Sequence, residues 1–143
     1  MATDTRHVLL LDAKQKRLNA GPKARLDTAH FLEQEGFRIQ KVPTSRSRYW
    51  QRLLALLASH TPWINFASDE VVWCQFPVEL PTRAAVKRAR SQGAKTVAFV
   101  HDIAGLKFQQ PDWDLIEKEA KLLQEFTWVI SLNGVISLSL IHI

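Results

Sequence analysis

The stretch VAFVHDIAGLKF, residues 97–108, begins as an unbroken apolar run and turns polar from one residue to the next. Val97 to Val100 show no alternation of apolar and polar side chains. This is typical of a strand covered on both faces, as in the parallel sheets of α/β proteins. His101 and Asp102 follow without a spacer. The stretch therefore predicts a buried parallel strand that delivers an imidazole and a carboxylate to the edge of its sheet.

Strand-like apolar runs alternate with segments of helical periodicity along the rest of the chain. Pro22 stands where proline favours the start of a helix, and Gly36 and Gly93 follow two predicted helices where glycine commonly ends them. This alternation indicates an α/β, Rossmann-like domain, with an open, mostly parallel sheet and helices on both faces. The predicted strands are 7–12, 37–42, 71–76, 96–100 and 128–132, and the predicted helices are 22–34, 49–59, 82–91 and 113–126.

Apolar residues at helical spacing predict which helix faces pack in the core. The tryptophans in or beside apolar segments are also expected in the core rather than stacked on a ligand. The helix-face residues are Ala24, Thr28, Phe31 and Leu32, then Tyr49, Trp50, Leu53, Leu54 and Leu57, then Ile116, Ala120 and Leu123; the tryptophans are Trp73, Trp113 and Trp128, with Trp63 in a loop.

Composition indicates one soluble globular domain of 143 residues, with 46% hydrophobic and 23% charged residues. The sequence has neither a secretory signal nor an apolar run long enough to cross a membrane, so a cytoplasmic location is expected. Cys74 is the single cysteine and is expected to be a buried, inert thiol. The net charge of +5 suits an anionic partner, whether nucleic acid, a nucleotide-activated substrate or an anionic membrane surface.

The chain ends in GVISLSLIHI, residues 134–143, an apolar tail with no polar exit. Residues 138–143 are also the translation, in one frame, of a common transposon-type sequencing adapter. We therefore expect residues 1–137 to be the native part of a truncated domain and residues 138–143 to be a non-native tail. The alternative is a genuine last strand, and no function is placed on His142.

Polar side chains follow several predicted strands, at the edge where ligands bind in doubly wound sheets. A helix N-terminus and Lys23 in the loop NAGPKA suit a phosphate or a sugar hydroxyl, although such a loop alone is more often a turn and cap. The loop is neither a P-loop nor a dinucleotide fingerprint. The candidates at this edge are Asp12, Asn19, Gly21, Lys23, Gln75, His101, Asp102, Ser131 and Asn133.

Each candidate also has a structural interpretation. His101 and Asp102 are a base with its orienting group, or two ligand contacts, or a backbone-bonded histidine beside a turn-capping aspartate. A metal site is weakly supported because no third ligand has useful spacing. Cations on predicted helix 82–91 spread around it instead of forming one strip, which favours a solvated surface over nucleic-acid binding.

Four stretches taken together resemble a known family. NAGPKARLD, VVWCQFPV, VAFVHDIAGLKF and EKEAKLLQEFTWVISLNG occur in that order between residues 19 and 134. They are similar to motifs of bacterial glycosyltransferases of the galactofuranosyltransferase and glucosyltransferase-three type. Two residues depart from the pattern: Lys107 stands where arginine is common, and Leu132 stands where histidine is common.

The resemblance implies the N-terminal, acceptor-side half of a GT-B enzyme, whose cleft lies between two Rossmann-like domains. The implied reaction transfers a sugar from a nucleotide sugar, expected to be a UDP-sugar, to a saccharide acceptor that is free or lipid-linked. No bound cofactor, metal or nucleic acid is expected, and peripheral contact with a membrane is compatible with the resemblance. The implied catalytic residues are His101 and Asp102, and the implied substrate-binding residues are Asn19, Gly21, Lys23, Gln75, Lys107 and Asn133.

Two other functions fit the same fold class. One is a non-catalytic Rossmann-like module that binds a nucleotide or acts as a receiver-like regulator. A receiver needs paired acids after its first strand, and Asp12 has no acidic neighbour. The other is a basic nucleic-acid binder, which would show strongly salt-dependent binding to duplex. If the transferase interpretation holds, this chain alone is expected to have little activity, because half of the cleft is absent.

Overall fold

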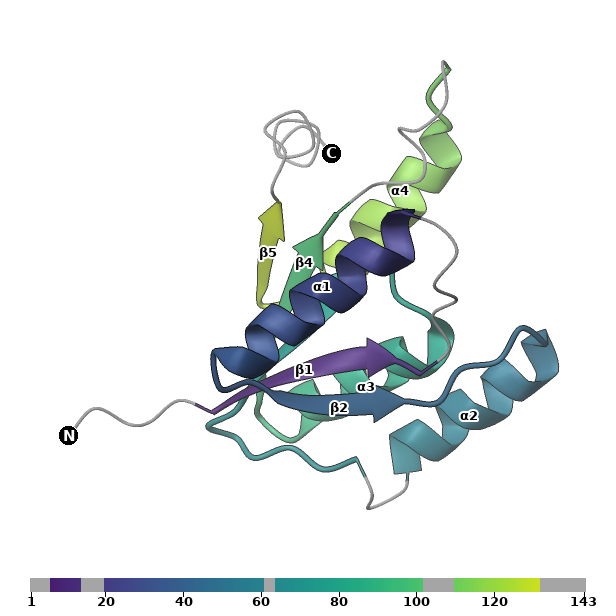
Figure 1. The fold of residues 1–143 in the computed structure, drawn as a ribbon. Coiled ribbons are helices and arrows are strands. Elements are labelled where there is room, and N and C mark those ends of the chain that lie inside the picture. The colour runs from purple at the N-terminus through teal and green to yellow at the C-terminus, as the bar shows by residue number, and fades with distance from the viewer. Residues whose placement is uncertain (1–5, 14–19, 61–63, 102–109, 132–143) are drawn as a thin grey trace.

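A computed structural model describes residues 6–13, 20–60, 64–101 and 110–131, with the side chains of the first helix described from Ala24 onward. Its strands and helices alternate as the sequence predicts (Figure 1). The strands are β1 His7–Asp12, β2 Arg38–Val42, β3 Val71–Phe76, β4 Lys95–Val100 and β5 Trp128–Ser131, and the helices are α1 Ala20–Gln34, α2 Arg48–His60, α3 Leu80–Ser91 and α4 Trp113–Leu123.

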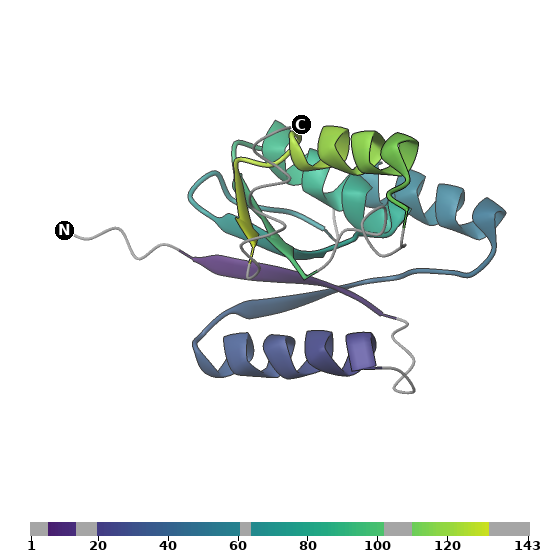
Figure 2. The ribbon, with the colours of Figure 1, turned by 90° about the horizontal axis from the view of Figure 1, so that it is seen from above.

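The described strands form one five-stranded sheet in the order β2-β1-β3-β4-β5, and every pair is parallel. Helix α1 covers one face of this sheet, and α2, α3 and α4 cover the other (Figure 2). The predicted α/β, Rossmann-like fold class is therefore confirmed. Within the described residues no helix has both the length and the apolar character that crossing a membrane requires.

The core lies on both faces of the sheet because side chains alternate along each strand. Leu9 and Leu11 pack against Ala29 of α1, whereas Val8 and Leu10 belong to a larger cluster on the other face. Cys74 also lies in that larger cluster and is fully buried, as predicted. The unbroken apolar run in β1 is thus explained by cover from both sides.

Two of the three predicted helix faces are partly wrong. In α1, Leu26, Ala29 and Leu32 pack toward the sheet, while Phe31 is exposed. In α2 the buried residue is Ala58. The α2 residue that faces the core is small and allows close approach of that helix, so its larger side chains lie elsewhere. In α2 the exposed large residues are Tyr49, Trp50, Leu56 and Leu57.

Two of the tryptophans are also not in the core. Trp113 and Trp128 are exposed, in contrast to their predicted packing. Trp73 is half-buried, lies edge-on to Phe37 and donates a hydrogen bond from Nε1 to Nδ1 of His7 over 3.1 Å. Trp63 lies outside the described residues.

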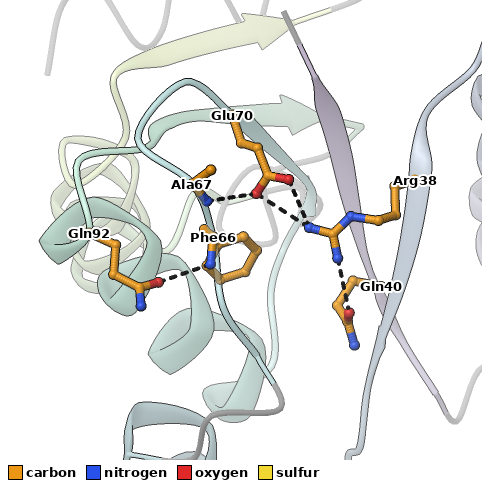
Figure 3. Close-up of polar contacts among 6 residues, drawn as sticks. All are labelled: Arg38, Gln40, Phe66, Ala67, Glu70 and Gln92. Atoms are coloured by element: carbon orange, nitrogen blue, oxygen red, sulfur yellow. Dashed lines mark hydrogen bonds and ion pairs between the residues drawn. The ribbon is translucent and has the colours of Figure 1, made fainter.

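A buried carboxylate ties several segments together at the N-terminal edge of the sheet (Figure 3). Glu70 accepts hydrogen bonds from Arg38 Nη2 at both oxygens, over 3.1 and 3.3 Å, and from the backbone N–H of Ala67 over 3.0 Å. Nearby, the side chain of Gln92 accepts from the N–H of Phe66 over 3.1 Å. The bonds from Arg38 and Ala67 satisfy the charge of Glu70, which burial would otherwise strongly disfavour.

Three arginines of α3 fasten this helix to its neighbours, although the cations of the helix remain exposed or half-exposed, as the sequence favours. Arg83 Nη2 lies 2.5 Å from Glu125 Oε1, and this hydrogen bond lowers the pKa of Glu125. Arg90 donates to the backbone carbonyl of Glu125. Arg88 donates to the carbonyl of Ser59 over 2.8 Å, which ties α3 to the end of α2.

Gly36 and Gly93 provide a matched test of helix termination. Both have a φ of +88°, but a Cβ at residue 93 would lie 3.2 Å from Ser68 Cβ, whereas a Cβ at residue 36 would meet nothing within 4 Å. We expect G36A to lower the free energy of unfolding by about 1 kcal/mol, from the left-handed backbone alone. G93A should lower the free energy of unfolding by about 2 kcal/mol, because Ser68 must also move. Urea unfolding measures both, and equal losses would contradict the role of Ser68.

Candidate functional site

The strand order places a switch point between β1 and β3. The connection from β1 leads outward to β2, whereas β3 leads to β4 on the other side. Ligands of open parallel sheets bind beyond the carboxyl ends of the strands at such a point. Gln75 lies near the end of β3, and His101 follows β4 directly. The candidate site is therefore the edge formed by the ends of β1, β3 and β4.

The side-chain amide of Gln75 joins three elements at this edge. Its Nε2 donates to the backbone carbonyl of Arg25 in α1 over 2.9 Å. Its Oε1 lies 3.1 Å from Nε2 of His101. Gln75 is only 5% exposed, so both ends of a buried amide are satisfied within the protein. One side chain thus holds α1, β3 and the residue after β4 in a common arrangement.

These two bonds also determine the proton arrangement on His101. Because Nε2 of Gln75 donates to a carbonyl, Oε1 must be the atom that faces the histidine, and it can only accept. His101 Nε2 therefore carries a proton. Burial, and then the positive charge of Arg25, hold the pKa of His101 below its usual 6.5. At neutral pH the ring is uncharged, so Nδ1 has an unshared electron pair.

Arg25 is a site residue that the sequence analysis missed. Its guanidinium Nη2 donates to the carbonyl of Pro77 over 3.1 Å, and its own carbonyl receives the Gln75 amide. Pro77 follows β3 through a cis peptide bond. Arg25 stands in the stretch NAGPKARLD, two residues after Lys23. Its position in the first half of α1 was the available signal, because the start of that helix lies at the ligand edge.

Asp12 lies at the same edge but on the other face of the sheet. Its carboxylate accepts a hydrogen bond from Thr82 Oγ1 in α3. Alternation along the strand sends Asp12 to the side of Val8 and Leu10, while Gln75 contacts α1 on the opposite side. Burial raises the pKa of Asp12, with a further contribution from Glu79. Asp12 therefore links β1 to α3 and is not a partner of His101.

The structure covers only part of the predicted site. It brings Gln75 and His101 into hydrogen-bond distance. The backbone of Gly21 and Lys23 lies in α1, before Arg25. Ser131 ends β5 and is half-buried. The functional roles of these residues stay predictions, and four further candidates lie outside the described residues: Asn19, Asp102, Lys107 and Asn133.

The described arrangement can support proton transfer from a hydroxyl group. A neutral imidazole of fixed tautomer, beside a guanidinium, is suited to accept a proton while a nearby cation attracts an anionic substrate. Phe99 packs edge-on against the His101 ring, at 4.8 Å between ring centres, and restricts its orientation. Within the part of the chain that the structure describes, no three His, Cys, Asp or Glu side chains group as a metal site would require.

Comparison with known proteins supports the glucosyltransferase-three part of the resemblance suggested by the motifs. Residues 5–140 match the family model described as "Glucosyltransferase 3-like, N-terminal domain". A search of curated proteins gives no significant match. The match covers almost the whole chain, including β1 to β5 and the edge that holds Gln75 and His101.

Replacement of Gln75 by glutamate tests how the amide controls His101. Q75E places a carboxylate beside the imidazole, which favours the imidazolium, so we expect the pKa of His101 to rise. Titration of the His101 Cε1–H resonance by NMR, assigned with H101Q, measures this change. Q124E adds the same charge in an exposed position after α4 and should leave the His101 titration unchanged. A His101 pKa that Q75E does not raise would contradict the arrangement.

The buried carboxylate of Asp12 should make stability depend on pH. Its pKa is higher in the folded state, so its stabilising contribution is complete below pH 3.8 and is lost as the pH rises through the folded-state pKa. D12N keeps an acceptor for Thr82 and removes the charge. We expect D12N to stabilise the protein by about 1 kcal/mol at pH 7, and by less near pH 3. Urea unfolding at both pH values, with D69N at an exposed position as the control, measures this difference.

Proposed function

This chain belongs to the glucosyltransferase 3-like N-terminal domain family, and from that membership we propose that it forms the acceptor side of a sugar-transferring active site. In this proposal the enzyme moves a sugar from a nucleotide-sugar donor, of the UDP-sugar class, to a hydroxyl of a saccharide acceptor. The observation that carries the proposal is the Gln75–His101 hydrogen bond at the switch point of the sheet.

His101 is the proposed general base. As the acceptor oxygen attacks the anomeric carbon of the donor, its proton passes to Nδ1 of His101. The bond between the anomeric carbon and the diphosphate oxygen breaks, and the nucleoside diphosphate leaves with the electron pair. The hydrogen bond from Nε2 to Gln75 keeps Nδ1 unprotonated before the reaction and orients the ring. Arg25 provides positive charge beside the reacting groups.

The remaining candidate residues have proposed roles that follow from the family motifs. Asp102 would help to orient the acceptor hydroxyl or the base. Backbone N–H groups at the start of α1, together with Lys23, would offset negative charge on the substrates. Substrate contacts are also proposed for Asn19, Gly21, Lys107 and Asn133. Gln75, whose two hydrogen bonds lie within the protein, has the proposed role of positioning His101.

A second domain is part of the proposal, because the matched family is described as an N-terminal domain. In a GT-B arrangement the second Rossmann-like domain would hold most of the nucleotide sugar and close the cleft over the edge described above. The alternative of a receiver-like regulator has less support. The 2-1-3-4-5 strand order is compatible with that fold, but the end of β3 has Gln75, Phe76 and Pro77 where a receiver would need its phosphoacceptor aspartate.

Activity of the two-domain enzyme tests the role of His101. We expect H101A to reduce kcat about 10²- to 10⁴-fold, as loss of a general base does, whereas H30A, at an exposed position on α1, should leave kcat unchanged. For the unaltered enzyme, kcat/KM should fall as the pH drops through the His101 pKa, below 6.5. Q75E should move this fall to higher pH. Full activity of H101A, or a pH profile that Q75E does not move, would refute the proposal.

A further inference from the structure

The helix α2 presents large apolar side chains to solvent. Tyr49 is 72% exposed, Trp50 is 53% exposed and Leu56 is 58% exposed. With 100° of rotation per residue, Tyr49, Leu53 and Leu56 fall within about 60° of one another, and Trp50 borders them. Ala58, the buried residue of α2, lies on the opposite side. The apolar stripe of this helix therefore faces away from the core that it would be expected to cover.

Positive charge lies along one side of this stripe. The sequence from residue 36 to residue 68 has no Asp or Glu. Arg46, Arg48 and Arg52 all lie in this segment and are exposed. Trp50 and Tyr49 also contact each other edge-to-face, at 5.7 Å between ring centres, which makes one aromatic surface. The result is an apolar aromatic face with arginine side chains next to it and no acidic residue in the same segment.

A surface of this kind fits an anionic lipid bilayer better than it fits a soluble protein. Interfacial helices combine Trp and Leu on one face with Arg or Lys beside it, and they lie in the plane of the headgroups. Trp and Tyr are the residues that favour the membrane–water boundary. Arginine side chains can extend to phosphate groups while their methylene stems remain in apolar surroundings. The 13 residues of α2 are too few to cross the bilayer.

We propose that the α2 outer face, defined as Tyr49, Trp50, Leu53 and Leu56 with Arg46, Arg48 and Arg52, docks this protein onto an anionic membrane surface. Its first turn lies near the ligand edge of the sheet. Gln51 Nε2 donates to Glu79 Oε2, just before α3, over 2.9 Å, and to the carbonyl of Ser45 over 2.7 Å. Docking would therefore bring the ends of the strands close to the lipid headgroups. The proposal does not depend on sugar transfer.

Vesicle flotation with the purified chain tests this docking. We expect binding to vesicles of phosphatidylcholine and phosphatidylglycerol, weak binding to pure phosphatidylcholine, and loss of binding at high salt. Trp50→Ser should weaken binding about tenfold through lost apolar burial. The pair Arg48→Glu and Arg52→Glu should weaken it about 25-fold or more, at about fivefold for each arginine charge removed.

Matched variants on α4 separate docking from general effects. Trp113 is 69% exposed, so Trp113→Ser removes an indole that is more exposed than that of Trp50. The pair Lys118→Glu and Lys121→Glu changes the net charge as much as the two arginine reversals do. Both α4 variants should retain binding, and circular dichroism should show every variant folded. Equal losses from α2 and α4 variants, or no binding to anionic vesicles, would overturn the proposal.

A protein partner is the competing outcome. Sedimentation velocity of the chain without lipid measures self-association. If Trp50→Ser abolishes self-association and leaves vesicle binding unchanged, the α2 outer face is an interface between protein molecules and the membrane proposal is wrong. If the chain remains monomeric and Trp50→Ser weakens flotation alone, the proposal is supported.

Discussion

Parallel pairing of every described strand is the constraint on which the rest of this structure depends. Parallel strands cannot be joined by tight hairpins, so each connection must return across a face of the sheet, here as a helix. The helices then cover both faces, and this cover makes the strands apolar without alternation. The same constraint sends all the strand ends to a single edge. Core and candidate site are therefore two consequences of one pattern of hydrogen bonds.

The buried amide of Gln75 shows how the fold prepares a site without a charged group at its centre. An unpaired buried amide would cost about 1–3 kcal/mol, so its two bonds, to the carbonyl of Arg25 and to His101, stabilise the arrangement that they define. Glu70 likewise connects several segments at the opposite edge of the sheet, but it does so with an ion pair to Arg38. The first arrangement leaves a ring nitrogen able to accept a proton, whereas the second uses its charged groups for structure alone.

Much of the fold could be predicted from the sequence because its signals are local. Apolar runs located the strands to within a residue at each end, and the positive-φ positions of Gly36 and Gly93 follow α1 and α3 as expected. Helix orientation was harder to predict. An apolar stripe shows that a helix has a distinctive face, but it does not say whether the sheet covers that face. Phe31 and Trp50 were therefore expected inside and lie outside, and α4 ends at Leu123, before the predicted Phe126.

The candidate site was partly predictable for the same physical reason. Gln75 lies near the end of one apolar strand and His101 follows another, so sequence alone placed them at the ligand edge. The bond between them depends on the register that sets Phe76 opposite Val100, which only the three-dimensional structure provides. Arg25 was missed because its contribution comes from the packing of α1 against the end of β3. This packing lets its guanidinium donate to the carbonyl of Pro77. Asp12 was expected among the ligand groups, and alternation along β1 instead directs it to α3.

Cys74 has a practical consequence for work on this protein. It is the single cysteine of the chain, lies fully buried in the middle of the sheet, and burial raises the pKa of its thiol. A thiol without solvent access and without thiolate character does not react with alkylating reagents while the fold is intact. The rate of alkylation at Cys74 thus reports opening of the sheet, and no cysteine has to be engineered for this measurement. A cysteine added at the surface could also carry a spectroscopic probe without competition from the native thiol.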